Sequence, residues 1–170
     1  MKILFVCHGN ICRSPMAEFV MRDVAAKAGI PGLEVESAAL HDDAIGCNIH
    51  GGTRRKLLAE GVPFFPRAAW RLTAKKAHEY DLVVGMDSYN MADLRALLSP
   101  EDLPKAHRLL EFAGKTRDIA DPWYTGNFDE TYADILEGCT ALAQKITSGE
   151  IADAKPAGRP RGKSGGPGAT

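Results

Sequence analysis

A short apolar segment near the start of the chain runs directly into a loop containing cysteine and arginine, and this arrangement constrains the fold most. Residues 2–6 (KILFV) are typical of a buried strand, and residues 7–14 (CHGNICRS) follow without a break. Pro15 then stands where a helix would begin, and the first turn of a helix favours proline. A strand, a loop and a helix in this order predict a loop at the carboxyl end of a sheet strand.

The chemistry of this loop suits a phosphate dianion. Arg13 stands six positions after Cys7, and the five residues between them can curve so that their backbone N–H groups point inward. The planar guanidinium of Arg13 matches two phosphate oxygens, and positive surroundings favour the nucleophilic thiolate of Cys7. Gly9 and Asn10 can adopt left-handed conformations in a tight turn. Because such a string also occurs by chance, with the cysteine only a small buried side chain, the prediction depends on the strand, loop and helix together.

Strand and helix patterns alternate along the rest of the chain. The expected helices are residues 14–28, 48–60, 73–79, 88–98 and 128–146, and the expected strands are residues 33–38, 81–86 and 106–110, with an extended piece at 67–72. This alternation, without hairpin signals, predicts an α/β single domain whose open parallel sheet of about four strands has helices on both faces. We expect a flavodoxin-like strand order, with the loop after the first strand at the ligand-binding edge.

Composition divides the chain into a domain and a tail. Residues 1–153 are expected to form one domain, because 45% hydrophobic and 25% charged residues are ordinary for a globular protein. Residues 154–170 carry four basic and no acidic residues and are rich in Gly and Pro, which predicts a disordered basic tail. So few charges do not predict specific nucleic-acid binding. The short N-terminal apolar run and the lack of a long one predict no secretory signal, no membrane span, a cytoplasmic location and free thiols.

A second motif supplies a candidate acid. Asp121 precedes Pro122, which stiffens the backbone, and Trp123 and Tyr124, which can wall a cleft. A phosphate ester attacked by Cys7 would lose its leaving oxygen faster if a carboxylic acid protonated that oxygen. Asp-Pro is also common in plain turns, and Asp118 and Asp129 are nearby alternatives.

Three segments resemble the low-molecular-weight protein tyrosine phosphatase family. Residues 6–18 (VCHGNICRSPMAE) resemble its signature loop, and residues 84–90 (VGMDSYN) and 121–124 (DPWY) resemble later segments in the same order. The similarity spans about residues 1–148. It implies a phosphatase that hydrolyses phosphotyrosine in proteins, and small aryl phosphates, through a phosphocysteine intermediate. Cys7 would be the nucleophile, Arg13 would bind phosphate, and Asp121 would act as general acid and then as base; no cofactor and no metal are implied.

The resemblance also suggests supporting residues. Asn10 and Ser14 would hold the loop and donate to the thiolate, although Asn10 can equally be a turn residue and Ser14 an N-cap. Cys12 resembles a second loop cysteine that can pair with Cys7 and protect it from overoxidation, or is simply a small side chain. Asp87 and Asn90 would shape the sheet end. The residues expected to bind substrate are His8, Gly9, Asn10, Ile11, Cys12, Ser14, Trp123 and Tyr124.

Residues 37–43 (SAALHDD) depart from the family pattern, which has Ser-Ala-Gly-Thr followed by an aromatic residue that lines the cleft. An acidic pair near the cleft leaves substrate preference open. Three alternatives also stay open: an arsenate reductase, which would need two further closely spaced cysteines; a phosphoarginine phosphatase, which tends to have threonine at Ile11; and a noncatalytic phosphoprotein-binding module. The expected partners are phosphotyrosine-containing proteins and a cognate tyrosine kinase.

Overall fold

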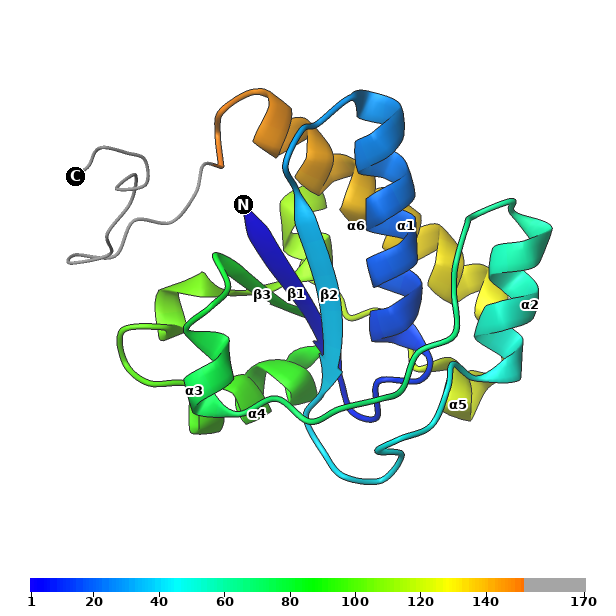
Figure 1. Ribbon diagram of the computed structural model, residues 1–170, viewed down its shortest axis with the longest axis horizontal. Coiled ribbons are helices and arrows are strands. Elements are labelled where there is room, and N and C mark those ends of the chain that lie inside the picture. Colours follow the sequence, from blue (N-terminus) through cyan, green and yellow to red (C-terminus); the bar gives the residue numbers. More distant parts are fainter. Residues whose placement is uncertain (152–170) are drawn as a thin grey trace.

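Four parallel strands form the centre of the molecule in the order β2-β1-β3-β4 (Figure 1). The structure is a computed structural model that describes residues 1–151. The strands are β1 (Lys2–Cys7), β2 (Glu34–Ala39), β3 (Leu82–Gly85) and β4 (Ala106–Arg108). The predicted parallel α/β sheet and its flavodoxin-like order are confirmed. From β1 the chain goes to β2 on one side and then to β3 on the other side of β1. The carboxyl end of β1 therefore lies where the strand order reverses.

Helices cover both faces of this sheet. They are α1 (Arg13–Ala28), α2 (Gly51–Ala59), α3 (Ala74–Ala77), α4 (Ser88–Leu97), α5 (Pro122–Thr125) and α6 (Phe128–Thr147), with 3₁₀ turns η1 (Leu103–Lys105) and η2 (Leu109–Ala113). Helices α1 and α6 lie side by side on one face, and α3 and α4 cover the other (Figure 1). No helix within residues 1–151 is long and apolar enough to cross a membrane.

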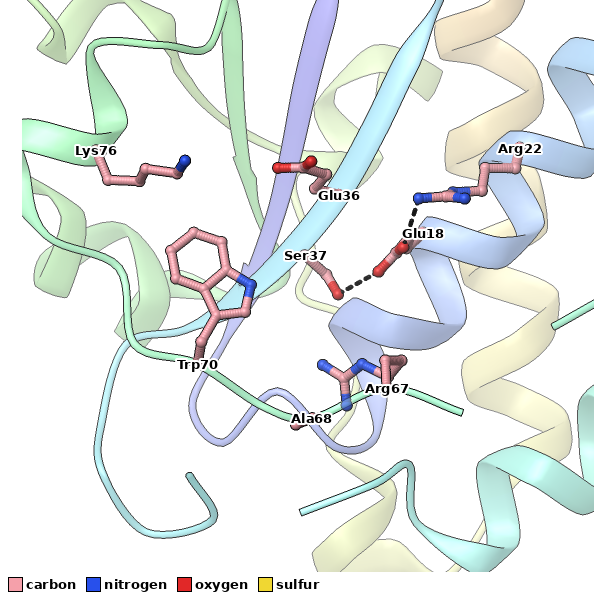
Figure 2. Close-up of a pocket in the computed structure, with 8 residues that line it drawn as sticks. All are labelled: Glu18, Arg22, Glu36, Ser37, Arg67, Ala68, Trp70 and Lys76. Carbon is pink, nitrogen blue, oxygen red and sulfur yellow. Dashed lines mark hydrogen bonds and ion pairs between the residues drawn. The ribbon is translucent and has the colours of Figure 1, made fainter. Parts of the chain in front are cut away.

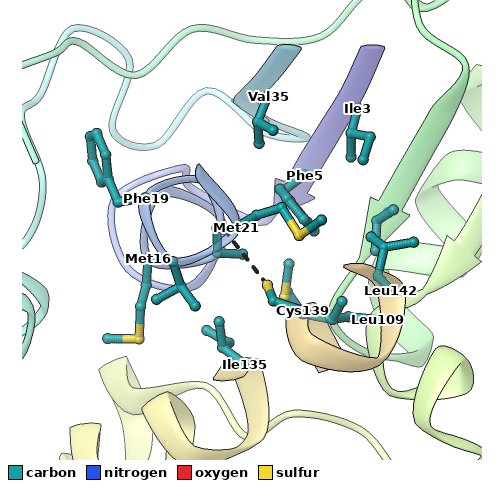
Figure 3. Close-up of a cluster of buried hydrophobic side chains, with 14 of the residues drawn as sticks. Ile3, Phe5, Met16, Phe19, Met21, Val35, Leu109, Ile135, Cys139 and Leu142 are labelled. Carbon is teal, nitrogen blue, oxygen red and sulfur yellow. Dashed lines mark hydrogen bonds between the residues drawn. The ribbon is translucent and has the colours of Figure 1, made fainter. Parts of the chain in front are cut away.

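Alternating side chains of β1 divide the core into two layers. Ile3 and Phe5 are fully buried against α1, α6 and η2, as Figure 3 shows, whereas Leu4 and Val6 pack towards α3 and α4. A strand that is buried on both faces needs apolar side chains at successive positions, which explains the KILFV segment. The two layers hold β1 rigidly, so the loop that follows it starts from a fixed point.

Several boundaries differ from the sequence predictions. Helix α1 begins at Arg13, with Cys12 at the N-cap position, so the alternative of Ser14 as N-cap is wrong. Strand β4 ends at Arg108, because Leu109 starts the 3₁₀ turn η2. The short helix α5 was not predicted, and α2 is shorter than expected because the ring of His50 caps it by accepting the N–H of Gly52.

Two further expectations concern the extended piece at residues 67–72 and the tail at residues 154–170. The extended piece at residues 67–72 is present as a segment along β2, joined to it by a parallel bridge between Ala39 and Arg71. The basic tail predicted at residues 154–170 lies outside the described residues.

Candidate active site

The nucleophile candidate stands at the end of β1. Cys7 is buried, its Sγ lies 3.1 Å from Ser14 Oγ, and the backbone N–H of Ser14 donates to the same sulfur at 3.4 Å. Ser14 belongs to the first turn of α1, so the positive end of that helix faces the sulfur. Two donors and a helix N-terminus at one sulfur are the surroundings in which reactive cysteines are found.

The turn of the loop depends on Asn10. Among residues 1–151 it is the one non-glycine residue with positive φ, 60°, so Asn10 and not Gly9 takes the left-handed conformation that both residues allow. Its side-chain Nδ2 donates to Ser14 Oγ at 2.8 Å and to Ser37 Oγ at 3.0 Å. The expectation that Asn10 donates directly to Cys7 is therefore wrong, because its amide donates to Ser14 and Ser37 instead. Because Ser14 Oγ already accepts from Asn10, its own proton is free for Cys7 Sγ.

Residues that the sequence did not single out support this turn from behind. Arg67 Nη2 donates to Asn10 Oδ1, and Ser37 Oγ donates to Glu18 Oε1 at 2.6 Å. Glu18, Ser37 and Arg67 also line a cavity of about 490 Å³, shown in Figure 2. Burial raises the pKa of Glu18 and lowers that of Arg67. No local pattern marks these residues, since they meet only through tertiary contacts.

Arg13 is fixed beside the nucleophile by partners far away in sequence. Its Nη1 donates to Asp87 Oδ2 at 2.7 Å and to the backbone oxygen of Ile119 at 2.9 Å, and its Nη2 lies 3.3 Å from Asp121 Oδ2. Burial opposes its charge, but Cys7, Asp87 and Asp121 together raise the pKa of Arg13. Asp87 also caps α4 by accepting the N–H of Asn90, as expected of residues that shape the sheet end.

Several donors at this place have no protein acceptor. The Nε atom of Arg13 is buried without a hydrogen-bond partner in the described part of the chain. The backbone N–H groups of residues 9–12 likewise have no acceptor within residues 1–151. Unpaired donors beside a helix N-terminus are suited to an oxyanion.

These groups line a cleft of about 860 Å³. It brings together most of the predicted site residues: Cys7, His8, Gly9, Ile11, Cys12, Arg13, Asp121, Trp123 and Tyr124. Asn10 and Ser14 are fully buried and are not among the lining residues, so they act through the loop. Among residues 1–151 there is no group of three His, Cys, Asp or Glu side chains placed to hold a metal ion.

Asp121 is the carboxylate best placed for acid chemistry. Its side chain is partly exposed in the cleft and caps α5 by accepting the N–H of Trp123 at 3.0 Å. Asp118 also lines the cleft, but it is bonded to the backbone of Ser88 and to Arg108. Asp129 pairs with Lys56 instead and does not line the cleft. Trp123 and Tyr124 are exposed on α5 at the cleft mouth.

The second loop cysteine, Cys12, is held in its neutral form. Burial, followed by the charges of Cys7 and Asp121, raises the pKa of Cys12 to about 12. Because only the thiolate form of a cysteine reacts as a nucleophile, Cys12 should be unreactive near neutral pH. Cys12 therefore remains a neutral thiol near Cys7.

We expect iodoacetamide at pH 7 to 8 to alkylate Cys7 and the exposed Cys47 but to leave Cys12 unmodified. Mass spectrometry of the digested protein would locate the modified residues. Inorganic phosphate should protect Cys7 by occupying the loop and should leave Cys47 reactive. Alkylation of Cys12 as fast as Cys7 would contradict the assignment of the two thiols.

Comparisons with known proteins agree over nearly the whole chain. Residues 2–151 match the family described as low molecular weight phosphotyrosine protein phosphatase. The low molecular weight protein-tyrosine-phosphatase YfkJ of Bacillus subtilis (strain 168) is 38% identical over 147 residues, covering 85% of this chain and 94% of that protein. Its counterpart PtpA of Staphylococcus aureus (strain MRSA252) is 33% identical over 145 residues, covering 85% of this chain and 92% of that protein.

Solved structures give the same picture. The crystal structure of YfkJ from Bacillus subtilis has a TM-score of 0.84 and 36% identity, covering 89% of this chain and 97% of that one. A structure described as Drosophila arginine phosphatase has a TM-score of 0.79 and 28% identity, covering 86% of this chain and 98% of that one. The resemblance inferred from the loop motif is thus confirmed, together with the hydrolase class of the relatives. The chain belongs to the low molecular weight phosphotyrosine protein phosphatase family.

Proposed function

We propose that this protein hydrolyses phosphotyrosine in proteins, and small aryl phosphates, through a phosphocysteine intermediate on Cys7. The observation that carries the proposal is the convergence of a buried thiol, a buried arginine and a carboxylate in one cleft. The unpaired donors around the sulfur give a phosphoryl group a place to bind.

The first step transfers the phosphoryl group to sulfur. The Cys7 thiolate attacks phosphorus, and the bond between phosphorus and the phenolic oxygen breaks as the S–P bond forms. The loop N–H groups and Arg13 hold the equatorial oxygens and stabilise the charge that they carry in the transition state. Asp121, in its acid form, gives its proton to the departing phenolic oxygen.

The second step releases phosphate. Asp121, now a carboxylate, takes a proton from a water molecule, and that water attacks the phosphorus of the phosphocysteine. The S–P bond breaks, and the sulfur leaves as a thiolate that Ser14 Oγ and the Ser14 N–H stabilise. Inorganic phosphate is the product, and the enzyme returns to its starting form.

The alternatives have less support. An arsenate reductase would need further cysteines close together, but Cys47 is exposed and Cys139 is buried, where its thiol donates to the backbone oxygen of Ala17. Arginine phosphatase activity should be tested, because one similar structure is described as a Drosophila arginine phosphatase. Against it, Ile11 places an apolar side chain in the cleft where phosphoarginine phosphatases of this family tend to have threonine.

Direct assay tests the proposal. We expect the purified protein to hydrolyse p-nitrophenyl phosphate and a phosphotyrosine peptide, with little release of phosphate from phosphoarginine and no reduction of arsenate. Phosphate release from phosphoarginine at a higher kcat/KM than from the phosphotyrosine peptide would reverse the assignment. A phosphotyrosine peptide that binds without turnover would indicate a binding module. The cognate kinase and the cytoplasmic location remain predictions.

A further inference from the structure

The lining of the cleft includes two histidine–carboxylate pairs, which together form what we call its histidine wall. The His8 and His41 rings stack with their centroids 4.3 Å apart. Nε2 of His8 lies 2.7 Å from Asp43 Oδ2, and Nε2 of His41 lies 2.8 Å from Asp93 Oδ2. The hydrogen bond with His8 lowers the pKa of Asp43, so this carboxylate stays ionised. The wall thus presents fixed carboxylates where the family pattern has an aromatic residue.

The lining of the cleft is rich in carboxylates, although the proposed substrate carries a phosphate dianion. Among the described residues, its lining contains one arginine, no lysine and five aspartates: Asp43, Asp87, Asp93, Asp118 and Asp121. Asp87 and Asp121 are engaged by Arg13 at the floor, and Asp118 pairs with Arg108. Asp43 and Asp93, each beside a histidine, are the two that no arginine or lysine of the described residues pairs with. A phosphoryl group bound by Arg13 therefore shares the cleft with a rim that carries the carboxylates of Asp43 and Asp93.

The buried Arg13 at the floor of the cleft independently indicates an anionic ligand. Arg13 is 2% exposed, and its Nε has no partner within residues 1–151. Because the floor takes the phosphate, the rim contacts whatever flanks the phosphotyrosine. In an extended peptide the neighbouring residues lie about 3.3 Å apart along the backbone, so the residues next to phosphotyrosine are the ones nearest to the rim.

Exposed aromatic side chains complete this surface. Tyr89, Trp123 and Tyr124 line the cleft and are 80%, 61% and 84% exposed. Aromatic faces bind ammonium and guanidinium groups and pack against their aliphatic stems. Carboxylates and aromatic rings together fit lysine and arginine, whereas glutamate and aspartate would meet repulsion.

We propose that this acidic and aromatic rim selects phosphotyrosine peptides whose flanking residues are lysine or arginine. The inference rests on the proposed phosphotyrosine hydrolysis and adds a substrate class to it. Asp43 and Asp93 are the specificity-determining residues.

The test compares two phosphotyrosine peptides that are identical except for lysine or glutamate at the two positions on each side. We expect the wild-type protein at pH 7.5 to give a kcat/KM about fivefold to tenfold higher for the lysine peptide, since each exposed ion pair contributes little. The ratio should fall by about twofold to threefold in Asp43→Asn and in Asp93→Asn. It should approach one in the double variant and at 1 M salt, where screening is strong.

A neighbouring aspartate provides the matched control. Asp42 has the same 69% side-chain exposure as Asp43, but it pairs with Arg71 and does not line the cleft. Asp42→Asn should therefore keep the wild-type ratio. Charge reversal in Asp43→Lys should lower the ratio further than Asp43→Asn does, an effect that a general loosening of the loop would not produce.

The outcomes separate the two proposals. Equal kcat/KM for both peptides in the wild type, with p-nitrophenyl phosphate still hydrolysed, would overturn the rim inference and leave the proposed function intact. A preference that Asp42→Asn removes as strongly as Asp43→Asn would also overturn it. If neither peptide nor p-nitrophenyl phosphate is hydrolysed, the proposed function fails, and the inference falls with it.

Discussion

Replacing Cys7 with serine should abolish phosphatase turnover while leaving the fold intact. A serine hydroxyl at this place is not ionised near neutral pH, so it cannot attack phosphorus at a useful rate, and we expect a loss on the order of 10⁵-fold or more. Serine has nearly the size of cysteine and can still accept from the backbone N–H of Ser14. The measurement is the steady-state hydrolysis of p-nitrophenyl phosphate, with circular dichroism to check folding.

The matched control is the exposed cysteine. Cys47→Ser removes a thiol of the same kind outside the cleft and should leave turnover at the wild-type level. The Cys7→Ser protein should still bind inorganic phosphate, because the loop donors and Arg13 remain. Turnover near the wild-type level in Cys7→Ser would end the assignment of Cys7 as nucleophile.

Asp121→Asn should slow esters with poor leaving groups far more than esters whose leaving group departs readily as an anion. General acid catalysis is worth about 10²–10⁴-fold, and this gain is needed only where the leaving oxygen requires a proton. Asparagine caps a helix about as well as aspartate, so the N–H of Trp123 keeps its acceptor and α5 its start. The variant therefore removes the proton and disturbs little else.

The measurement is kcat/KM, or a single-turnover rate that isolates phosphoenzyme formation, for a series of aryl phosphates of rising leaving-group pKa. Plots of log rate against that pKa should be steeper for Asp121→Asn than for the wild type. Asp129→Asn is the control, since Asp129 pairs with Lys56 outside the cleft, and it should follow the wild-type line. An equal loss for every ester would show that Asp121 only shapes the loop, and Asp118 would be the next candidate acid.

Local pattern was sufficient for the strand, loop and helix that begin the chain. The apolar run 2–6, buried on both faces, and Pro15 in the first turn each have one structural interpretation. At the start of α1, residue type led to the wrong N-cap. Serine is a favoured N-cap, but the hydroxyl of Ser14 is engaged by Cys7 and Asn10, so Cys12 occupies the cap position without a side-chain cap bond.

The rest of the site depends on contacts across long stretches of chain. Arg13 meets Asp121 at a separation of 108 residues, and Asn10 meets Ser37 and Arg67 across β2 and the following segment. Periodicity and spacing carry no information about such pairs. The pairing of His41 with Asp93 was missed for the same reason, although the departure of residues 37–43 from the family pattern indicated that this wall would differ.

The buried pairing of Arg13 with Asp87 has a consequence for the thermodynamics of ligand binding. A free arginine side chain carries about 2 kcal/mol of rotamer entropy, which an arginine on the surface would lose when it grips an anion. Here Asp87 and the backbone oxygen of Ile119 already hold the guanidinium in one orientation, with Nε still unpaired. The conformational freedom of Arg13 is thus given up during folding, and an oxyanion that arrives later meets a donor that has little left to lose.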